Sequence, residues 1–185
     1  MSGKTTSIYV HSHPFFIMKR IAITGRPGVG KSTVCRNIVK HLTCTYGGMV
    51  TADIRVEGER VGFNIMDIST KEQGILAHKV GSGPLFGKYY VNLEDLNNIG
   101  VKGIKNALNY DLVVIDEIAP MEFKSQEFVQ IVEKALDSGK DMLVVLHQKS
   151  NHPLAQRIRE EFEIYTVTED NRESIVAVIV NKIEK

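Results

Sequence analysis

Apolar residues in this 185-residue chain form two kinds of run, which alternate along most of the sequence. Continuous runs at residues 21–23, 112–115 and 142–146 predict strands that are buried on both faces of a parallel sheet. Between them, apolar positions recur every three or four residues, as in helices that pack one face on a sheet. The pattern predicts an α/β fold of about five mainly parallel strands, with helices on both faces of the sheet.

The helical stretches carry recognisable ends. Ser125 is placed to cap one helix, which ends at Gly139, and Pro153 is placed to open the next. One further helix is expected to end at about His41, and another to run from about Leu93 to Leu108. A last helix is expected near the end of the chain, where Ile175, Ile179 and Ile183 share one face.

Residues 49–68 interrupt this alternation of strands and helices. Their pattern predicts a β-hairpin that turns near Gly58, as an antiparallel insertion beside the parallel sheet. Residues 69–92 are the least regular part of the chain, with glycine or proline at positions 81, 83, 84 and 87. Glycine-rich loops of this kind often carry binding surfaces or lids.

The first apolar run leads into a glycine-rich loop and then into a helical pattern. The loop follows the pattern G-x-x-x-x-G-K-S, which between a strand and a helix is a P-loop, a phosphate-binding motif. Its backbone N–H groups and the positive end of the following helix favour a bound triphosphate. Lys31 is expected to contact the β- and γ-phosphates, and Ser32 to ligate Mg²⁺. The predicted nucleotide-binding residues of this motif are Gly25, Arg26, Pro27, Gly28, Val29, Gly30, Lys31, Ser32 and Thr33.

An acidic pair, Asp116 and Glu117, follows the buried run at residues 112–115. Ligands of parallel sheets bind at the carboxyl ends of the strands, which is where this pair should lie. Asp116 is the expected partner of Mg²⁺, directly or through a water molecule. Because neighbours on a strand point to opposite sides, Glu117 is expected to point elsewhere and to take a proton from a water aligned on the γ-phosphorus. The pair therefore favours hydrolysis as the reaction.

His147 directly follows the strand predicted at residues 142–146. The acidic pair is similar to that of P-loop proteins in which another strand lies between the glycine-loop strand and the acidic strand, so residues 142–146 are predicted to lie there. His147 would then sit opposite the γ-phosphate and could sense it or orient the water. A strand-end histidine that turns to solvent fits the sequence equally well.

Asn171 and Arg172 follow the last predicted strand, in the loop that reaches the base in P-loop folds. Asn171 could meet a purine edge, while Arg172 could stack on the base or reach phosphate. One asparagine contact permits only weak selection among bases, because one net hydrogen bond is worth about 1 kcal/mol. Alternatively, Thr168 or Asp170 in this loop simply caps the last helix.

Composition narrows the range of partners. The formal net charge of +1 provides no field for nucleic acid or an anionic membrane, and no apolar run approaches the ~18 residues of a membrane span. The two cysteines, Cys35 and Cys44, are expected to be reduced, as in a cytoplasmic enzyme. The length predicts one domain at residues 18–185, preceded by a loose N-terminal extension at residues 1–17.

With these motifs in place, the chain resembles the nucleoside-triphosphatase family known from thermophiles, also called cancer-related nucleoside-triphosphatase. The resemblance covers about residues 18–185. The chain departs from the family pattern at Ala119, where glycine is usual, and at Lys149, where arginine is usual. The match rests on the glycine loop, His147 and the strings at residues 56–63, 87–92, 115–122 and 167–172.

The resemblance implies Mg²⁺-dependent, slow hydrolysis of ATP, GTP and other nucleoside triphosphates to diphosphate and phosphate, with low base selectivity. Two other functions stay open at this point. A nucleotide or nucleoside kinase would need a second, basic pocket for an acceptor and an arginine-bearing lid, and Arg55, Arg60 and Lys88 could supply one. A nucleotide-controlled switch would instead use residues 69–92 to engage a partner protein.

Overall fold

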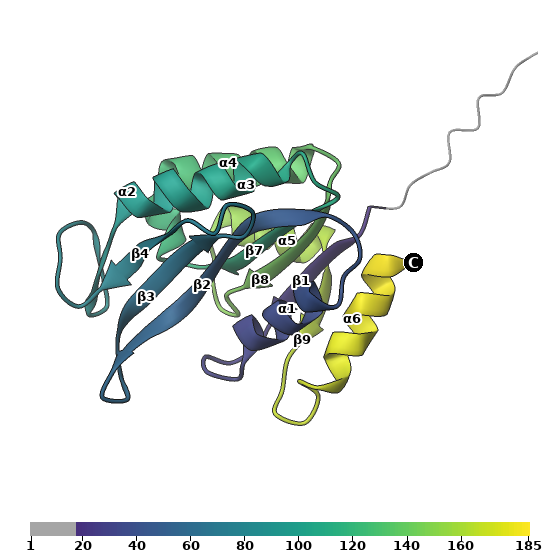
Figure 1. The fold of residues 1–185 in the computed structure, drawn as a ribbon, viewed down its shortest axis with the longest axis horizontal. Helices are drawn as coiled ribbons and strands as arrows, with labels where there is room; N and C mark the ends of the chain where they lie inside the picture. The colour runs from purple at the N-terminus through teal and green to yellow at the C-terminus, as the bar shows by residue number, and fades with distance from the viewer. Residues whose placement is uncertain (1–17) are drawn as a thin grey trace, which may run out of the picture.

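The fold is built on one mixed sheet that helices cover on both faces (Figure 1). The computed structural model describes residues 18–185, so the predicted extension at residues 1–17 lies outside the described residues. Over the described residues the sheet has nine strands in the order β5-β6-β4-β3-β2-β7-β8-β1-β9. The strands are β1 (Arg20–Thr24), β2 (Tyr46–Val56), β3 (Glu59–Asp67), β4 (Gln73–His78), β5 (Leu85–Phe86), β6 (Tyr89–Val91), β7 (Leu112–Ile118), β8 (Asp141–Leu146) and β9 (Glu163–Thr166).

The helices follow the predicted positions closely. Ser125 caps its helix by accepting a hydrogen bond from the Phe128 backbone, and Pro153 opens α5, as predicted. None of the helices in residues 18–185 has the length and apolarity needed to cross a bilayer. The helices are α1 (Lys31–Lys40), α2 (Leu93–Asp95), which continues through a π-helical turn (Leu96–Val101) into α3 (Lys102–Ala107), a 3-10 turn (Glu122–Lys124), α4 (Gln126–Asp137), α5 (Pro153–Glu161) and α6 (Ser174–Glu184).

The parallel half of the sheet consists of β2, β7, β8, β1 and β9. Strand β8 pairs with β1 on one side and with β7 on the other, so it lies between the glycine-loop strand and the acidic strand. In this register Val145 is opposite both Ile23 and Asp116. The predicted insertion of residues 142–146 between these two strands is therefore confirmed.

The other half of the sheet corrects the prediction of a mainly parallel sheet. Among residues 18–185, four strand pairings are parallel and four are antiparallel. The predicted hairpin is present as β2 and β3, but β4, β5 and β6 extend it through residues 69–92. Strands of two and three residues, such as β5 and β6, are too short to show a period in the sequence.

Strand β2 is continuous from the parallel half into the hairpin. Residues 46–50 pair in parallel with β7, and residues 49–56 pair antiparallel with β3. Gly48 lies inside this strand. A Cβ atom at Gly48 would lie 1.9 Å from the Val114 carbonyl oxygen, so the glycine permits close approach of the two strands.

Two apolar cores lie on opposite faces of the sheet. Alternate residues of β7 show the division: Val113 and Ile115 pack into one core, and Leu112 and Val114 into the other. The first core contains the faces of α3, α4 and α5, and the second those of α1 and α6. Strand β7 is therefore buried on both faces, as its continuous apolar run predicts.

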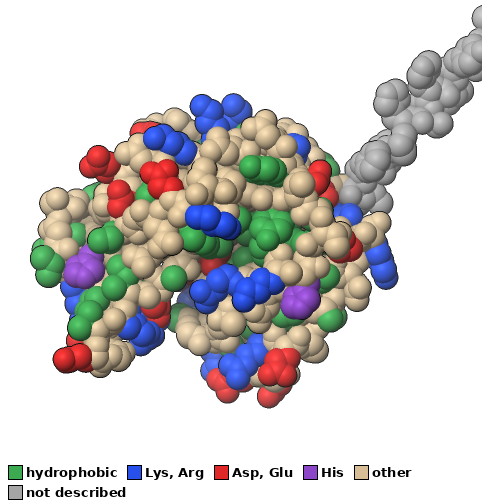
Figure 2. All heavy atoms as spheres, viewed as in Figure 1, with side chains coloured by type: hydrophobic (Ala, Val, Ile, Leu, Met, Phe, Trp, Pro, Cys, Tyr) green, Lys and Arg blue, Asp and Glu red, His purple; other side chains and the backbone are tan. Residues whose placement is uncertain are grey.

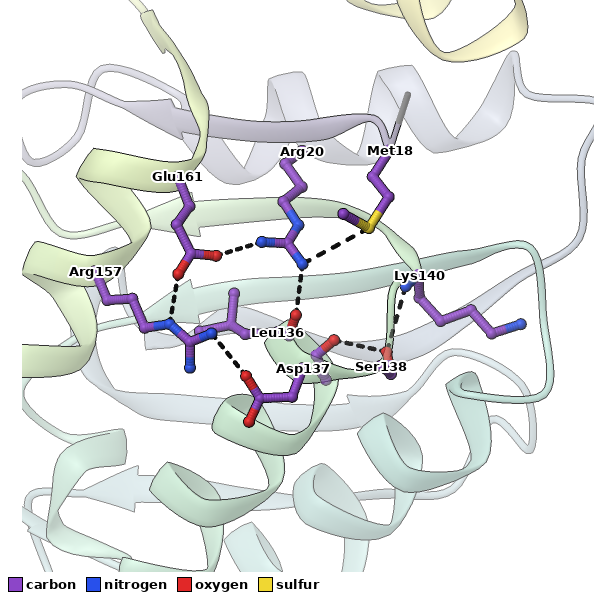
Figure 3. A network of polar contacts seen from close by, with 9 residues as sticks. Met18, Arg20, Leu136, Asp137, Ser138, Lys140, Arg157 and Glu161 are labelled. Atoms are coloured by element: carbon purple, nitrogen blue, oxygen red, sulfur yellow. Dashed lines mark hydrogen bonds and ion pairs between the residues drawn. The ribbon is translucent and has the colours of Figure 1, made fainter. Parts of the chain in front are cut away.

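At the amino end of β1, a polar network joins the strand to α4 and α5 (Figure 3). Arg20 donates to Glu161 and to the Leu136 carbonyl, while Arg157 pairs with Glu161 at 2.6 Å and Asp137 at 2.7 Å. The network lies at the end of β1 opposite the glycine loop, which follows Thr24. It is therefore a structural feature rather than part of the candidate site.

Candidate active site

The glycine loop, residues 25–30, connects the carboxyl end of β1 to α1. Gly30 stands at the helix N-terminus with φ of 101°, a left-handed conformation that glycine adopts without strain. Gly25 lies close to the connection after β9, since a Cβ atom there would be 2.7 Å from the Val167 carbonyl oxygen. Ten residues of helix follow, so the loop and the first turn of α1 offer backbone N–H groups and a positive helix end to an anion.

The predicted nucleotide-binding residues of the loop, other than Gly25 at its start, divide into three groups. Arg26 projects into solvent with its side chain 77 % exposed, where it lies 3.9 Å from Glu169. Val29 is buried in the core that contains α1 and α6. The remaining residues line a cleft beside the loop: they are Pro27, Gly28, Gly30, Lys31, Ser32 and Thr33.

The two acidic residues at the end of β7 contact the first two residues of α1. The Ser32 hydroxyl donates a 2.9 Å hydrogen bond to Oδ1 of Asp116. Nζ of Lys31 lies 3.8 Å from Oε1 of Glu117, at ion-pair distance. The structure thus brings together the predicted metal ligands and two of the predicted catalytic residues.

These contacts correct the expectation that Glu117 points away from the position of Asp116. Strand alternation would send the two side chains to opposite faces. The pairing of β7 with β8 instead shifts in register between Asp116 and Ile118, so Glu117 falls within an irregularity of the ladder. Both carboxylates consequently meet the same end of α1, through Lys31 and Ser32.

Burial dominates the electrostatics of this acidic pair. Asp116 has no exposed surface, and burial raises the pKa of its carboxyl to about 7, although the Ser32 hydrogen bond opposes the change. The pKa of Glu117 is also raised by burial, and the charges of Lys31 and His147 act to lower it. Oδ2 of Asp116 and Oε1 of Glu117 are buried without a hydrogen-bond partner. Unpaired buried polar atoms are rare in proteins, so this pair is suited to receive further ligand atoms.

His147 lies in the same cleft as Glu117 and Lys31. Its backbone N–H donates to the Ile118 carbonyl, which fixes the residue just past the acidic pair. Nδ1 of its ring accepts a 3.3 Å hydrogen bond from the Lys149 backbone. The residue is half-buried and lines the cleft.

The cleft has a volume of about 730 Å³ and separates the glycine loop from the hairpin β2–β3. Figure 2 shows the surface hollowed between these two parts at its lower edge, with lysine and arginine side chains beside the hollow. The glycine-loop wall carries Lys31 and Arg36, and the hairpin wall carries Arg55 and Arg60. Four cationic side chains therefore surround a space that also contains Glu117.

A second cavity, of about 760 Å³, runs between α1 and α6. Arg172 lines it together with Thr33 and Asn37, so this residue is within reach of a molecule bound at the loop. Asn171 is used differently: its side chain accepts from the Thr168 backbone at 2.8 Å and donates to the Thr166 carbonyl at 2.9 Å. The amide that was expected to meet a base instead holds its own loop together.

The sequence left open that Thr168 or Asp170 caps the last helix, and over residues 18–185 the structure shows no such cap. Helix α6 begins at Ser174 after Glu173, and no side chain caps it within the described residues. The Thr168 hydroxyl instead accepts a hydrogen bond from the Asn171 backbone. The loop is thus closed by its own polar side chains.

The residue that sequence reasoning missed in this cleft is Glu122. It is only 3 % exposed, lines the cleft, and has a pKa that burial raises well above its ordinary value. In the sequence it appeared only as the end of the string at residues 115–122. An acidic residue in a short turn gives no signal that it is buried.

Comparison with known proteins agrees with this geometry. The sequence model of a family described as NTPase matches residues 20–180. A nucleoside-triphosphatase THEP1 from Methanosarcina acetivorans is 53 % identical over 169 residues, which span 89 % of this chain and 97 % of that protein. The THEP1 of Methanocaldococcus jannaschii is 43 % identical, over 89 % of this chain and 96 % of that protein.

Two solved structures share the fold. The crystal structure of THEP1 from Aquifex aeolicus matches with a TM-score of 0.80 and 28 % identity, over 89 % of this chain and 99 % of that one. The solution structure of a human cancer-related nucleoside triphosphatase matches with a TM-score of 0.71 and 30 % identity, over 90 % and 97 % of the two chains. The chain described here belongs to the NTPase family.

Proposed function

We propose that this chain is a Mg²⁺-dependent nucleoside-triphosphatase with a P-loop NTPase three-layer fold. It hydrolyses ATP, GTP and other nucleoside triphosphates to diphosphate and phosphate, in keeping with the names of its relatives. The observation that carries the proposal is the meeting of Lys31, Ser32, Asp116 and Glu117 where β7 ends and α1 begins. We also propose a cytoplasmic location, based on the expectation of two reduced cysteines.

The donor set at this position fits Mg²⁺. The Ser32 hydroxyl and the Asp116 carboxylate are hard oxygen donors, and Oδ2 of Asp116 is buried with no hydrogen-bond partner. No group of three His, Cys, Asp or Glu side chains within residues 18–185 could hold a metal alone. Nucleotide and water oxygens would therefore complete the coordination, as is usual for Mg²⁺. When bound with the nucleotide, Mg²⁺ supplies positive charge that offsets charge on the phosphate oxygens.

Glu117 has the properties of a general base. Its side chain lies in the cleft, has a buried oxygen without a hydrogen-bond partner, and has a raised pKa that makes it a better proton acceptor. Lys31 now lies beside it at 3.8 Å. With a triphosphate in the glycine loop, the Lys31 ammonium would contact phosphate oxygens, and Glu117 would hold the attacking water. His147, in the same cleft, would orient that water or contact the γ-phosphate.

Base selectivity should be weak, because the Asn171 amide is held by its own loop. At saturating Mg²⁺, we expect kcat/KM for ATP, GTP, CTP and UTP to lie within about tenfold, the effect of about 1.4 kcal/mol. Steady-state phosphate release with each nucleotide, with a chelator as control, measures both the selectivity and the metal dependence. A thousandfold preference for ATP over CTP, or equal rates with the chelator, would contradict the proposal.

The buried Asp116 carboxyl should make the metal-free protein less stable as pH rises. Its pKa is about 7 in the folded chain and 3.8 ordinarily, so the folded state binds the proton more tightly. The free energy of unfolding should fall between about pH 4 and 7 and level off above that range. Asp116→Asn removes this penalty and should stabilise the chelator-treated protein at pH 8 by up to about 4 kcal/mol.

Urea unfolding of both proteins at pH 4, 6 and 8 measures this difference. The Asp137→Asn variant is the control, because that side chain is 67 % exposed on α4. A gain in stability for Asp116→Asn that is the same at every pH would show that ionisation of Asp116 is not the cause.

A further inference from the structure

Unpaired buried polar atoms gather around the cleft. In residues 18–185, five buried side-chain atoms lack a hydrogen-bond partner. Only Nε of Arg20 belongs to a residue at the opposite end of β1. The other four are Asp116 Oδ2, Glu117 Oε1, Arg60 Nε and Glu122 Oε2, and each residue lines the cleft or bonds to a residue that does.

The proposed hydrolysis accounts for only two of these four atoms. Oδ2 of Asp116 and Oε1 of Glu117 lie where the metal and the attacking water would be. Arg60 Nε and Glu122 Oε2 belong to the hairpin wall and to the turn after β7, and nothing in the hydrolytic reaction uses them. Native proteins rarely leave such atoms unpaired, so this second pair marks a place for a further ligand.

Aromatic rings surround Arg60 on the hairpin side of the cleft. Its guanidinium carbon lies 5.3 Å from the centre of the Phe63 ring, and the Phe63 and Tyr89 rings meet edge to face at 5.2 Å. Phe86 and Met121 line the cleft beside them. Aromatic side chains and two unpaired hydrogen-bonding groups in the same cleft suit a flat molecule with a polar edge.

The nucleoside triphosphate of the proposed function would not fill this part of the cleft. The cleft and the groove between α1 and α6 share only Gly30 and Thr33, at the start of α1. In the proposed function, a triphosphate held at that point would have its γ end beside Glu117 and its base end toward the groove that Arg172 lines. The aromatic side of the cleft therefore lies beyond the γ-phosphate.

We propose that this aromatic side of the cleft binds a second small molecule, a nucleobase in the form of a nucleoside. Arg60 Nε and Glu122 Oε2 contact polar atoms on the edge of the base. The Phe63 ring packs on its face, and Tyr89 supports that ring edge to face. The proposal rests on the proposed function, because that function places the triphosphate elsewhere. A ligand here occupies the space beside the attacking water, so it inhibits hydrolysis without competing with the triphosphate.

Arg55 provides a matched control for Arg60. Both guanidiniums line the cleft and pair with Oδ2 of Asp53, at 2.8 Å from Arg55 and 2.9 Å from Arg60. Arg55 also donates to the Gly58 carbonyl, so it is engaged within the hairpin, whereas Nε of Arg60 is unpaired.

Glu122→Met keeps the length of the side chain and removes the unpaired carboxyl, so the variant should fold.

The test is calorimetric titration of adenosine, guanosine, cytidine and uridine into the chain, both free and saturated with Mg²⁺ and the β,γ-imido analogue of ATP. At least one nucleoside should bind the loaded chain, one molecule per chain, with a Kd of about 1 mM or lower. Arg60→Ala and Glu122→Met should each weaken that binding at least about tenfold, the effect of losing a hydrogen-bonding partner. Arg55→Ala should change it by less than about threefold.

Three results would overturn the proposal. They are no binding of any nucleoside to either form, displacement of the nucleoside by the ATP analogue, and equal binding by Arg60→Ala, Glu122→Met and the unaltered chain. If the analogue itself does not bind, the proposed hydrolysis is wrong. In that case the free chain tests the second ligand site. Nucleoside binding that Arg60→Ala and Glu122→Met both weaken supports the site, and binding that neither variant changes refutes it.

Discussion

Replacing Lys31 with alanine should lower the rate of phosphate release from ATP by about 10³-fold or more and weaken triphosphate binding. The Lys31 side chain is the cation at the start of α1 that also meets Glu117, and it is only 11 % exposed. Its loss removes a positive charge that acts on the phosphates in both the ground state and the transition state. It also deprives Glu117 of the nearest charge that holds its pKa down.

Steady-state kinetics with ATP and titration of a non-hydrolysable analogue measure the two effects separately. Lys40→Ala is the matched control, because Lys40 is exposed at the other end of the same helix. It should leave both quantities within about twofold of the unaltered chain. Near-native turnover in Lys31→Ala would mean that the glycine loop is not the catalytic site.

The second large effect is expected at Glu117, where glutamine should lower kcat by about 10² or more while nucleotide affinity stays equal or increases. A general base contributes about 10² to 10⁴ to a rate. Glutamine keeps the shape and hydrogen-bonding reach of the side chain, but it cannot accept the proton. It also removes a carboxylate near bound phosphates, so binding does not suffer.

Asp116→Asn gives the contrast that separates a base from a metal ligand. It should weaken Mg²⁺ and lower both kcat and kcat/KM, because the metal then lacks a charged ligand. Raising the Mg²⁺ concentration should rescue Asp116→Asn in part and leave Glu117→Gln unchanged. If Glu117→Gln hydrolyses ATP at the unaltered rate with Mg²⁺ saturating, Glu117 is not the base.

The sequence predicted those parts of the site that rest on short, local patterns. The loop at residues 25–30 and the acidic pair after residues 112–115 each follow a run that a parallel sheet would bury. Parallel strands bring their carboxyl ends to one edge, so Ser32 and Asp116 meet although they lie 84 residues apart in the sequence. The place of β8 beside both strands was predicted from the same acidic pair, and it brought His147 into the cleft.

The features that escaped prediction depend on contacts between distant residues. Glu117 lies where the pairing of β7 with β8 shifts in register, and no pattern within β7 records that shift. Asn171 was expected to reach a base, but asparagine side chains also bond to nearby backbone, and this one does. The burial of Glu122 results from packing beside the cleft and has no counterpart in the sequence.

The most direct measurement is a ³¹P NMR time course of ATP with the purified chain, Mg²⁺ and no added acceptor. Hydrolysis at the site of Lys31 and Glu117 predicts equal amounts of ADP and inorganic phosphate, formed over many turnovers. The reaction should stop with a chelator and fall by about 10² or more in Glu117→Gln. Two results would contradict hydrolysis at this site. In one, ATP persists until a phosphoryl acceptor is added; in the other, Glu117→Gln hydrolyses ATP as fast as the unaltered chain.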